Sequence, residues 1–133
     1  MARFVFNVRH LSKDGRPKAG AFSPEYYNGR FETSVCGLEG VGDERLWHLG
    51  ATIRAQAKLS AVAALQVSTK SISFVGLVCE PAPMVDFPEH GVIIGWADGD
   101  DEKHKRIAKQ QALADAITTT DVRRPPTYVS PLN

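Results

Sequence analysis

Two of the four histidines lie beside apolar segments, where an imidazole could do acid–base chemistry. His10 ends a short alternating segment near the start of the chain, and His90 precedes the apolar run from Val92 to Trp96. Imidazole titrates near neutral pH, so two rings in one cleft could act as general acid and base on a phosphodiester, with Arg9 or Lys13 stabilising the developing charge. The alternative is a structural role for each ring at a strand end. The sequence favours this alternative, because neither histidine lies in a recognisable hydrolase motif.

The segment 9–18 is rich in cations, and phosphate groups are bound by such cations together with backbone amides in glycine-containing loops. Only Asp14 opposes the cations of this segment, which are Arg9, Lys13, Arg16 and Lys18. These four residues are the candidate site for phosphate or nucleic acid. The alternative is a solvated hairpin tip whose charges keep a sheet edge from pairing with other chains, and the sequence favours it slightly.

Spacings typical of metal sites, nucleotide-binding loops and serine nucleophiles are missing from the sequence. The acidic run from Asp98 to Glu102 lacks the alternating spacing of a calcium loop, and Cys36 and Cys79 lie far apart. We therefore expect no metal and no cofactor. We interpret the cysteines as packed thiols of a protein kept in a reducing cytoplasm.

The segment 121–133 predicts an extended tail, because its three prolines cannot continue a helix. A tail with apolar side chains is a candidate for docking on a protein partner or on a second copy of the chain. Part of it also matches the short PPxY form that WW-type grooves accept. The candidate docking residues are Pro125, Pro126, Tyr128, Val129 and Leu132.

Alternation of apolar and polar residues predicts strands that would carry these side chains. The expected strands are 3–10, 30–37, 72–78 and 92–96. Apolar residues at helical spacing predict a helix over 44–58, which Gly50 could end early, and the Ala-rich segment 59–67 predicts a second. A last helix is expected from the acidic residues 98–101 to Ile117. Its buried stripe would consist of Ile107, Leu113, Ala114 and Ile117.

The bulk properties fit one ordinary globular domain. The chain has 133 residues, of which 43% are hydrophobic, and a net charge of +1. Residues 1–66 carry nine cations against six carboxylates and residues 67–133 carry seven against nine, so the first half is the better candidate for an anion. The start of the chain lacks the apolar region of a signal peptide, and no apolar run is long enough to span a bilayer. We therefore expect no membrane association.

These features predict an α+β domain over residues 1–120, followed by the tail over 121–133. A mixed or antiparallel sheet of about four strands would be covered by two or three helices. The leading functional interpretation is a small intracellular, non-catalytic accessory component that binds a macromolecular partner through its loops and tail. The alternatives are a phosphodiester- or nucleotide-acting hydrolase using His10 and His90, and a nucleic-acid-binding module using the loop 9–18.

Overall fold

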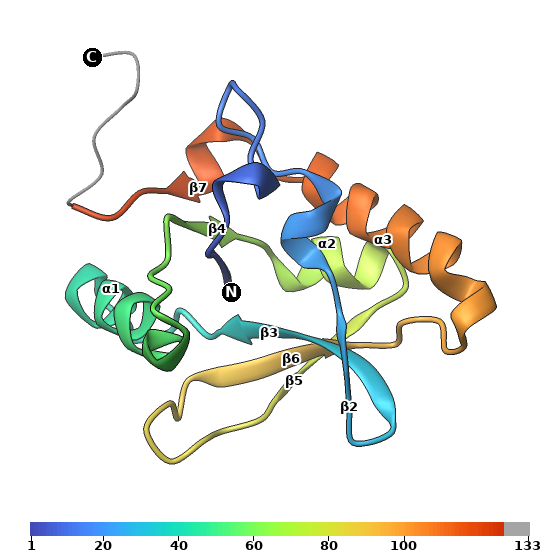
Figure 1. Ribbon diagram of the computed structural model, residues 1–133, viewed down its shortest axis with the longest axis horizontal. Coiled ribbons are helices and arrows are strands. Elements are labelled where there is room, and N and C mark those ends of the chain that lie inside the picture. Colours follow the sequence, from blue (N-terminus) through green and yellow to red (C-terminus); the bar gives the residue numbers. More distant parts are fainter. Residues whose placement is uncertain (127–133) are drawn as a thin grey trace.

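A seven-stranded sheet with antiparallel pairing throughout forms the centre of the structure (Figure 1). A computed structural model describes residues 1–126 of the chain. Along the sheet the strands are β5 (Val78–Pro81), β6 (His90–Ile94), β3 (Arg30–Cys36), β1 (Ala2–Val5), β4 (Ala63–Gln66) and β7 (Val122–Arg123), and β2 (Glu25–Tyr27) forms a hairpin with β3. The expected α+β class is confirmed. The estimate of about four strands is wrong.

Helices cover both faces of this sheet. On one face, α1 (Asp43–Thr52) contributes Leu46 and Leu49 to a core that includes Phe4. On the other face lie α2 (Thr69–Phe74), α3 (Lys103–Asp115) and the 3-10 turn η2 (Ala19–Phe22), over a core that includes Val5 and Leu65. Successive side chains of a strand point to opposite faces, so a single strand such as β1 supplies both cores.

The Ala-rich segment 59–67 contains β4, so the helix expected there is wrong. The side chains of residues 63–65 are all buried, because β4 lies between β1 and β7 with a core on each side. A strand that is covered on both faces has a continuous apolar sequence, which periodicity cannot separate from a buried helix.

The segment 72–78 begins as a helix, so the strand expected there is also wrong. Ser68 caps α2 by accepting a hydrogen bond from the Ser71 amide at 3.0 Å, and the strand starts only at Val78. The first predicted helix ends at Thr52 rather than at residue 58, and the 3-10 turn η3 (Ala55–Ala57) follows it.

The last predicted helix is confirmed, although its buried face differs from the expected stripe. The 3-10 turn η4 (Asp100–Glu102) leads into α3. Leu113, Ala114 and Ile117 are buried as expected, whereas Ile107 is exposed and the polar Arg106 and Gln110 are buried in its place.

The remaining 3-10 turns are η1 (Val8–His10) and η5 (Thr119–Asp121). The first predicted strand therefore ends at Val5 instead of continuing to residue 10. At the other end of the chain β7 pairs with β4, so the sheet extends past residue 120 into the segment predicted as tail. No helix within residues 1–126 is long and apolar enough to cross a membrane.

Candidate anion-binding face

The side chain of Arg3 fills a gap in the middle of the sheet. β1 and β3 share a single register pair, Ala2 with Cys36. Beyond this pair, Arg3 Nη1 donates a hydrogen bond to the carbonyl of Ser34 on β3, and Nε donates to the carbonyl of Ala21 in η2, both at 2.9 Å. Burial lowers the pKa of Arg3 to about 10, with Glu25 opposing this shift and Arg54 adding to it. A cation is thus fixed where the two halves of the sheet meet.

His10 packs against the same 3-10 turn. A methyl group added to Gly20 would lie 3.0 Å from His10 Cδ2, so η2 passes directly beside the ring. Burial lowers the pKa of His10, and the neighbouring charge of Arg3 lowers it further. Both effects favour the neutral form of His10.

The loop 9–18 is a tight hairpin with its cations on the outside. Leu11 and Pro17 form a bridge, and the Ser12 amide donates to the Arg16 carbonyl at 2.8 Å. The Asp14 carboxylate accepts hydrogen bonds from the Ser12 hydroxyl and the Arg16 amide, so it is engaged within the hairpin. The four side chains predicted to bind phosphate, Arg9, Lys13, Arg16 and Lys18, are exposed.

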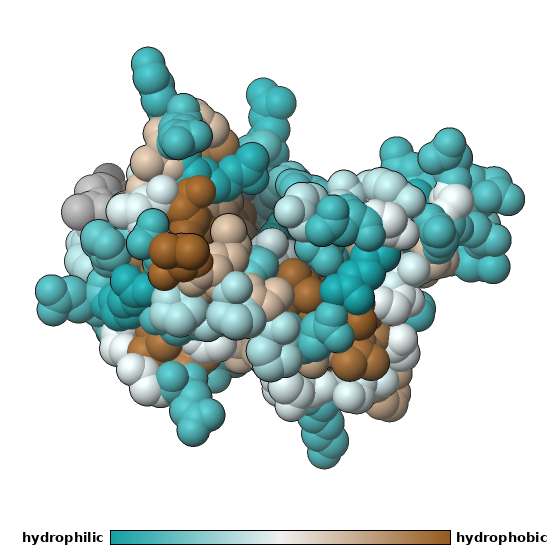
Figure 2. Space-filling view, turned by 90° about the horizontal axis from the view of Figure 1, so that it is seen from below, coloured by the Kyte–Doolittle hydropathy of each residue, from teal (hydrophilic) through white to brown (hydrophobic). Residues whose placement is uncertain are grey.

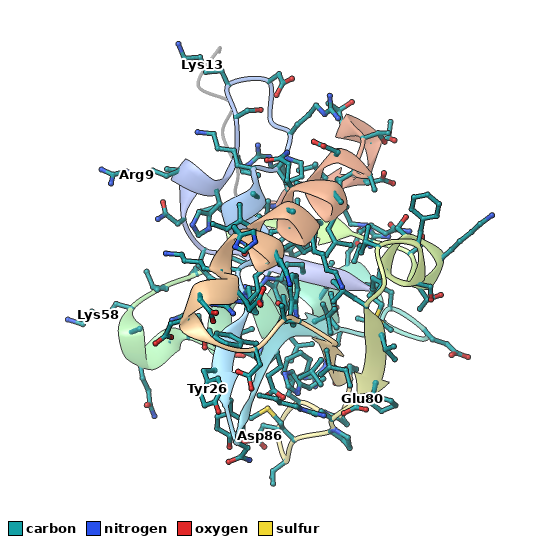
Figure 3. All side chains as sticks on the ribbon, turned by 90° about the vertical axis from the view of Figure 1, so that its right-hand side faces the viewer. Arg9, Lys13, Tyr26, Lys58, Glu80 and Asp86 are labelled. Atoms are coloured by element: carbon teal, nitrogen blue, oxygen red, sulfur yellow. The ribbon has the colours of Figure 1, made fainter. Side chains whose placement is uncertain are left out.

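A second exposed segment, far from this loop in the sequence, supplies two more cations. All residues from 51 to 60 are exposed, and the guanidinium of Arg54 lies over the ring of Phe6 at 5.4 Å. Figure 3 shows Arg9 and Lys58 extending from one side of the molecule, where Tyr26 also lies, and Lys13 extending from the tip of the loop at the top of the view. We call the set of seven cations the basic face: Arg3, Arg9, Lys13, Arg16, Lys18, Arg54 and Lys58.

The electrostatics of the basic face differ from those of the rest of the chain. The segments 1–27 and 51–60, which carry its seven cations, contain two carboxylates and have a net charge of +5, so the remaining residues of the +1 chain carry a net −4. Within residues 1–126 five ion pairs form, and none uses a cation of the basic face: Arg30–Glu32, Arg30–Glu80, Arg45–Glu89, Lys105–Glu102 and Arg123–Asp43. These cations are therefore not neutralised by an ion pair within residues 1–126.

The two histidines of the hydrolase hypothesis are not brought together. His90 is the register partner of Cys36, which pairs with Ala2 at the beginning of β1, whereas His10 follows beyond the other end of that strand. His90 Nδ1 lies 2.8 Å from the carbonyl oxygen of Ala82, and its ring packs on Phe87 at 5.1 Å. The two rings thus have separate surroundings, and paired acid–base chemistry has no geometric support within residues 1–126.

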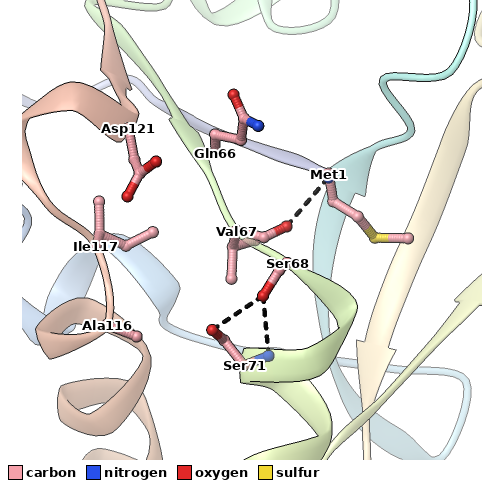
Figure 4. Close-up of a pocket in the computed structure, with 8 residues that line it drawn as sticks. All are labelled: Met1, Gln66, Val67, Ser68, Ser71, Ala116, Ile117 and Asp121. Atoms are coloured by element: carbon pink, nitrogen blue, oxygen red, sulfur yellow. Dashed lines mark hydrogen bonds between the residues drawn. The ribbon is translucent and has the colours of Figure 1, made fainter.

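A small polar cavity of about 230 Å³ lies between β4, α2 and the segment after α3 (Figure 4). The Ser68 hydroxyl caps α2, and Asp121 accepts a hydrogen bond from the Thr118 amide at 3.0 Å. Gln66 Oε1 accepts from Arg123 at 2.9 Å. The polar side chains that line this cavity therefore have local structural roles.

Large apolar side chains are exposed along the segment 74–85. Phe74 is 91% exposed and Val85 is 98% exposed, and Val78 and Met84 are also exposed. Figure 2, which shows the face that carries the β5–β6 hairpin, has hydrophobic residues in separate places within a polar surface. Of the predicted docking residues, Pro125 and Pro126 follow β7, whereas Tyr128, Val129 and Leu132 lie outside the described residues.

Residues 1–126 offer neither a cluster of metal ligands nor a reactive thiol. In this range no group of three His, Cys, Asp or Glu side chains could hold a metal ion. Cys36 and Cys79 are free, and burial raises the pKa of Cys36 to about 11, with Glu89 adding to the shift. Burial also raises the pKa of Cys79, so both thiols are poor nucleophiles at neutral pH.

Sequence reasoning found the four cations of the loop but missed the other three members of the basic face. In the sequence Arg3 is an ordinary residue of a predicted strand. Its hydrogen bond to the Ser34 carbonyl on β3 forms only because β1 and β3 share a single register pair, which the sequence does not show. The sequence places Arg54 and Lys58 within the predicted helix 44–58, whereas α1 ends at Thr52. Comparison with family models, curated proteins and solved structures finds no match for this chain.

Proposed function

We propose that the chain is a nucleic-acid-binding module that holds phosphate groups with its basic face. One observation carries the proposal: Arg9 and Lys58, from segments far apart in the sequence, extend from the same side of the molecule (Figure 3), and no ion pair within residues 1–126 uses a cation of the basic face.

The spread of these cations favours a polymer over a small phosphate ester. A small ester is held by donors that converge on one point, whereas a nucleic-acid backbone presents a charge at regular intervals and is met by cations spaced over a surface. Arg9 and Lys13 belong to the loop 9–18 and Lys58 to the segment after α1, and the three side chains extend outward instead of converging.

The salt dependence of binding tests this proposal. We would measure the affinity for a fluorescent oligonucleotide by anisotropy over a range of salt concentrations. The slope of log K against log salt is about −0.7 to −0.9 per phosphate contact. Arg9→Gln with Lys58→Gln should weaken binding several-fold and reduce the slope by about two contacts.

The matched control removes the same charge from exposed or half-exposed lysines outside the basic face, with Lys70→Gln and Lys109→Gln. The variant with Lys70→Gln and Lys109→Gln should have nearly the same slope of log K against log salt as the unmodified protein. If both double variants weaken binding equally, only net charge matters and the proposed face is wrong. An affinity that does not depend on salt also contradicts the proposal.

A second candidate function is the one that the sequence favours, a non-catalytic component that binds a protein partner. Its specific support is the exposure of Phe74 and Val85, because large apolar side chains at the surface often mark protein contacts. Pull-down from the native host and size-exclusion chromatography would compare the full chain with Phe74→Ser and with a chain lacking 127–133. A truncation at 127 leaves β7 intact. Unchanged partner retention and assembly in both variants would remove this candidate.

A further inference from the structure

The β2–β3 hairpin presents two adjacent tyrosines to solvent. Tyr26 is 60% exposed and Tyr27 is 62% exposed, although aromatic rings usually bury most of their surface. Adjacent residues of a strand point to opposite faces, so the two rings have different surroundings. Tyr26 and Tyr27 thus carry the same phenol ring at nearly the same exposure, but in different surroundings.

Tyr26 lies on a stack of supporting side chains. Its ring meets the ring of Phe31 edge-on, with centroids 5.1 Å apart and planes at 72°. The guanidinium of Arg106 covers Phe31 at 4.0 Å, and Nη1 of Arg106 donates to the carbonyls of Ala97 and Gly99, both at 2.8 Å. One side of Tyr26 is thus fixed in place while most of the ring stays accessible.

Tyr27 shares its face of the hairpin with charged residues. In the register of this hairpin Glu25 is opposite Glu32 and Tyr27 is opposite Arg30, so these four side chains point to one face. Glu32 is paired with Arg30, whereas Glu25 is exposed. A phosphate beside Tyr27 would therefore approach the carboxylates of Glu25 and Glu32.

The hairpin that carries Tyr26 adjoins the basic face. β2 follows η2, whose Ala21 carbonyl holds Arg3, and Glu25 is close enough to Arg3 to raise its pKa. Tyr26 lies on the same side of the molecule as Arg9 and Lys58 (Figure 3). A nucleic-acid backbone bound by these cations can place a base at Tyr26.

We infer that Tyr26 is a stacking platform for an unpaired base, so that the basic face takes single-stranded rather than duplex nucleic acid. This inference rests on the proposed function. Aromatic side chains bind single strands by stacking on base faces, which contribute affinity whatever the sequence. A duplex hides these faces, so a stacking platform selects the single strand.

Three probes with matched phosphate content test the inference: a single-stranded oligonucleotide, an abasic version of it, and a short duplex. We expect Tyr26→Ala to weaken single-strand binding about 5- to 100-fold. The same substitution should leave abasic and duplex binding within about twofold, because phosphate contacts are kept. Tyr27→Ala is the matched control and should change single-strand affinity by less than about twofold.

Tyr26→Leu distinguishes a loss of base stacking from a loss of folding, because a leucine still packs on Phe31 but cannot stack on a base. It should weaken single-strand binding as Tyr26→Ala does, with an unchanged thermal midpoint. Equal losses for Tyr26→Ala and Tyr27→Ala, or an equal loss on the abasic probe, would overturn the inference while leaving salt-dependent binding intact. A wild-type chain that binds none of the three probes overturns the proposed function as well.

Discussion

Arg3 donates a hydrogen bond to the backbone carbonyl of Ser34 across the gap between β1 and β3, at 2.9 Å. The two strands share one register pair, so this side chain takes the place of the ladder that would otherwise join them. The same guanidinium holds η2 through the carbonyl of Ala21. One residue thus joins the two halves of the sheet and forms the inner part of the basic face.

Replacing Arg3 with Met should destabilise the fold by about 2–4 kcal/mol, because two carbonyls lose a charged donor. The free energy of unfolding in urea measures this loss. Arg3→Lys is the control: it keeps the charge, but its single ammonium cannot reproduce the planar fork, so an intermediate loss is expected. A stability of Arg3→Met equal to that of the wild type would show that the gap is held by other contacts.

Acidification should destabilise the chain through His10. Its pKa is lowered in the folded state, so the unfolded state takes up a proton first as the pH falls through about 6.5. Stability is therefore lost between this value and the folded-state pKa, and the loss is complete below the latter. Urea unfolding at about pH 8 and about pH 5 should show a larger decrease for the wild type than for His10→Gln. Equal decreases would mean that the ring is not held neutral.

Removing Arg106 should also cost stability, although arginine is usually a surface residue. Arg106 is buried, stacks on Phe31 and satisfies the carbonyls of Ala97 and Gly99. We expect Arg106→Met to lower the free energy of unfolding by about 2–4 kcal/mol. Lys103→Met on the same helix is exposed and should have an effect below about 0.5 kcal/mol. A similar result for both would contradict the structural role of Arg106.

Local patterns predicted those elements that have one buried and one exposed face. The segment 30–37 matches β3 closely, and α3 follows an acidic start as expected. β6, which has buried residues on both faces, begins and ends two residues before the predicted strand 92–96. β4 was missed because both of its faces are covered, so its sequence carries no alternation. In α2 the buried Ile72 and the exposed Phe74 only resemble strand alternation, and the capping contact from Ser68 decides the local structure.

The candidate site was predicted only as far as it is local in sequence. Four cations lie within one loop and could be grouped by inspection. Arg54 joins them because α1 ends at Thr52 and returns the chain toward β1, which is a tertiary event. The predicted pairing of His10 with His90 failed for the same reason, because it depends on strand register, which local sequence does not give. The register of β1, β3 and β6 places the two histidines toward opposite ends of β1.

Gly50 offers a test of how tightly α1 packs on the sheet. It lies inside α1, where alanine would be favoured by about 1 kcal/mol on helix propensity alone. A methyl group there would lie 2.9 Å from Ala61 Cβ and 3.1 Å from Phe4 Cε1, and the Ala61 amide donates to the Gly50 carbonyl at 2.8 Å. The neighbouring backbone is therefore tied in place and cannot easily move aside.

We expect Gly50→Ala to destabilise the fold, because overpacking costs about 1–3 kcal/mol and exceeds the gain in propensity. Adding Ala61→Gly removes the closest methyl group, so the double variant should be more stable than the sum of the two single changes predicts. Urea unfolding of the four proteins gives this coupling. A Gly50→Ala variant more stable than the wild type would show that α1 does not rest on Phe4 and Ala61 as described.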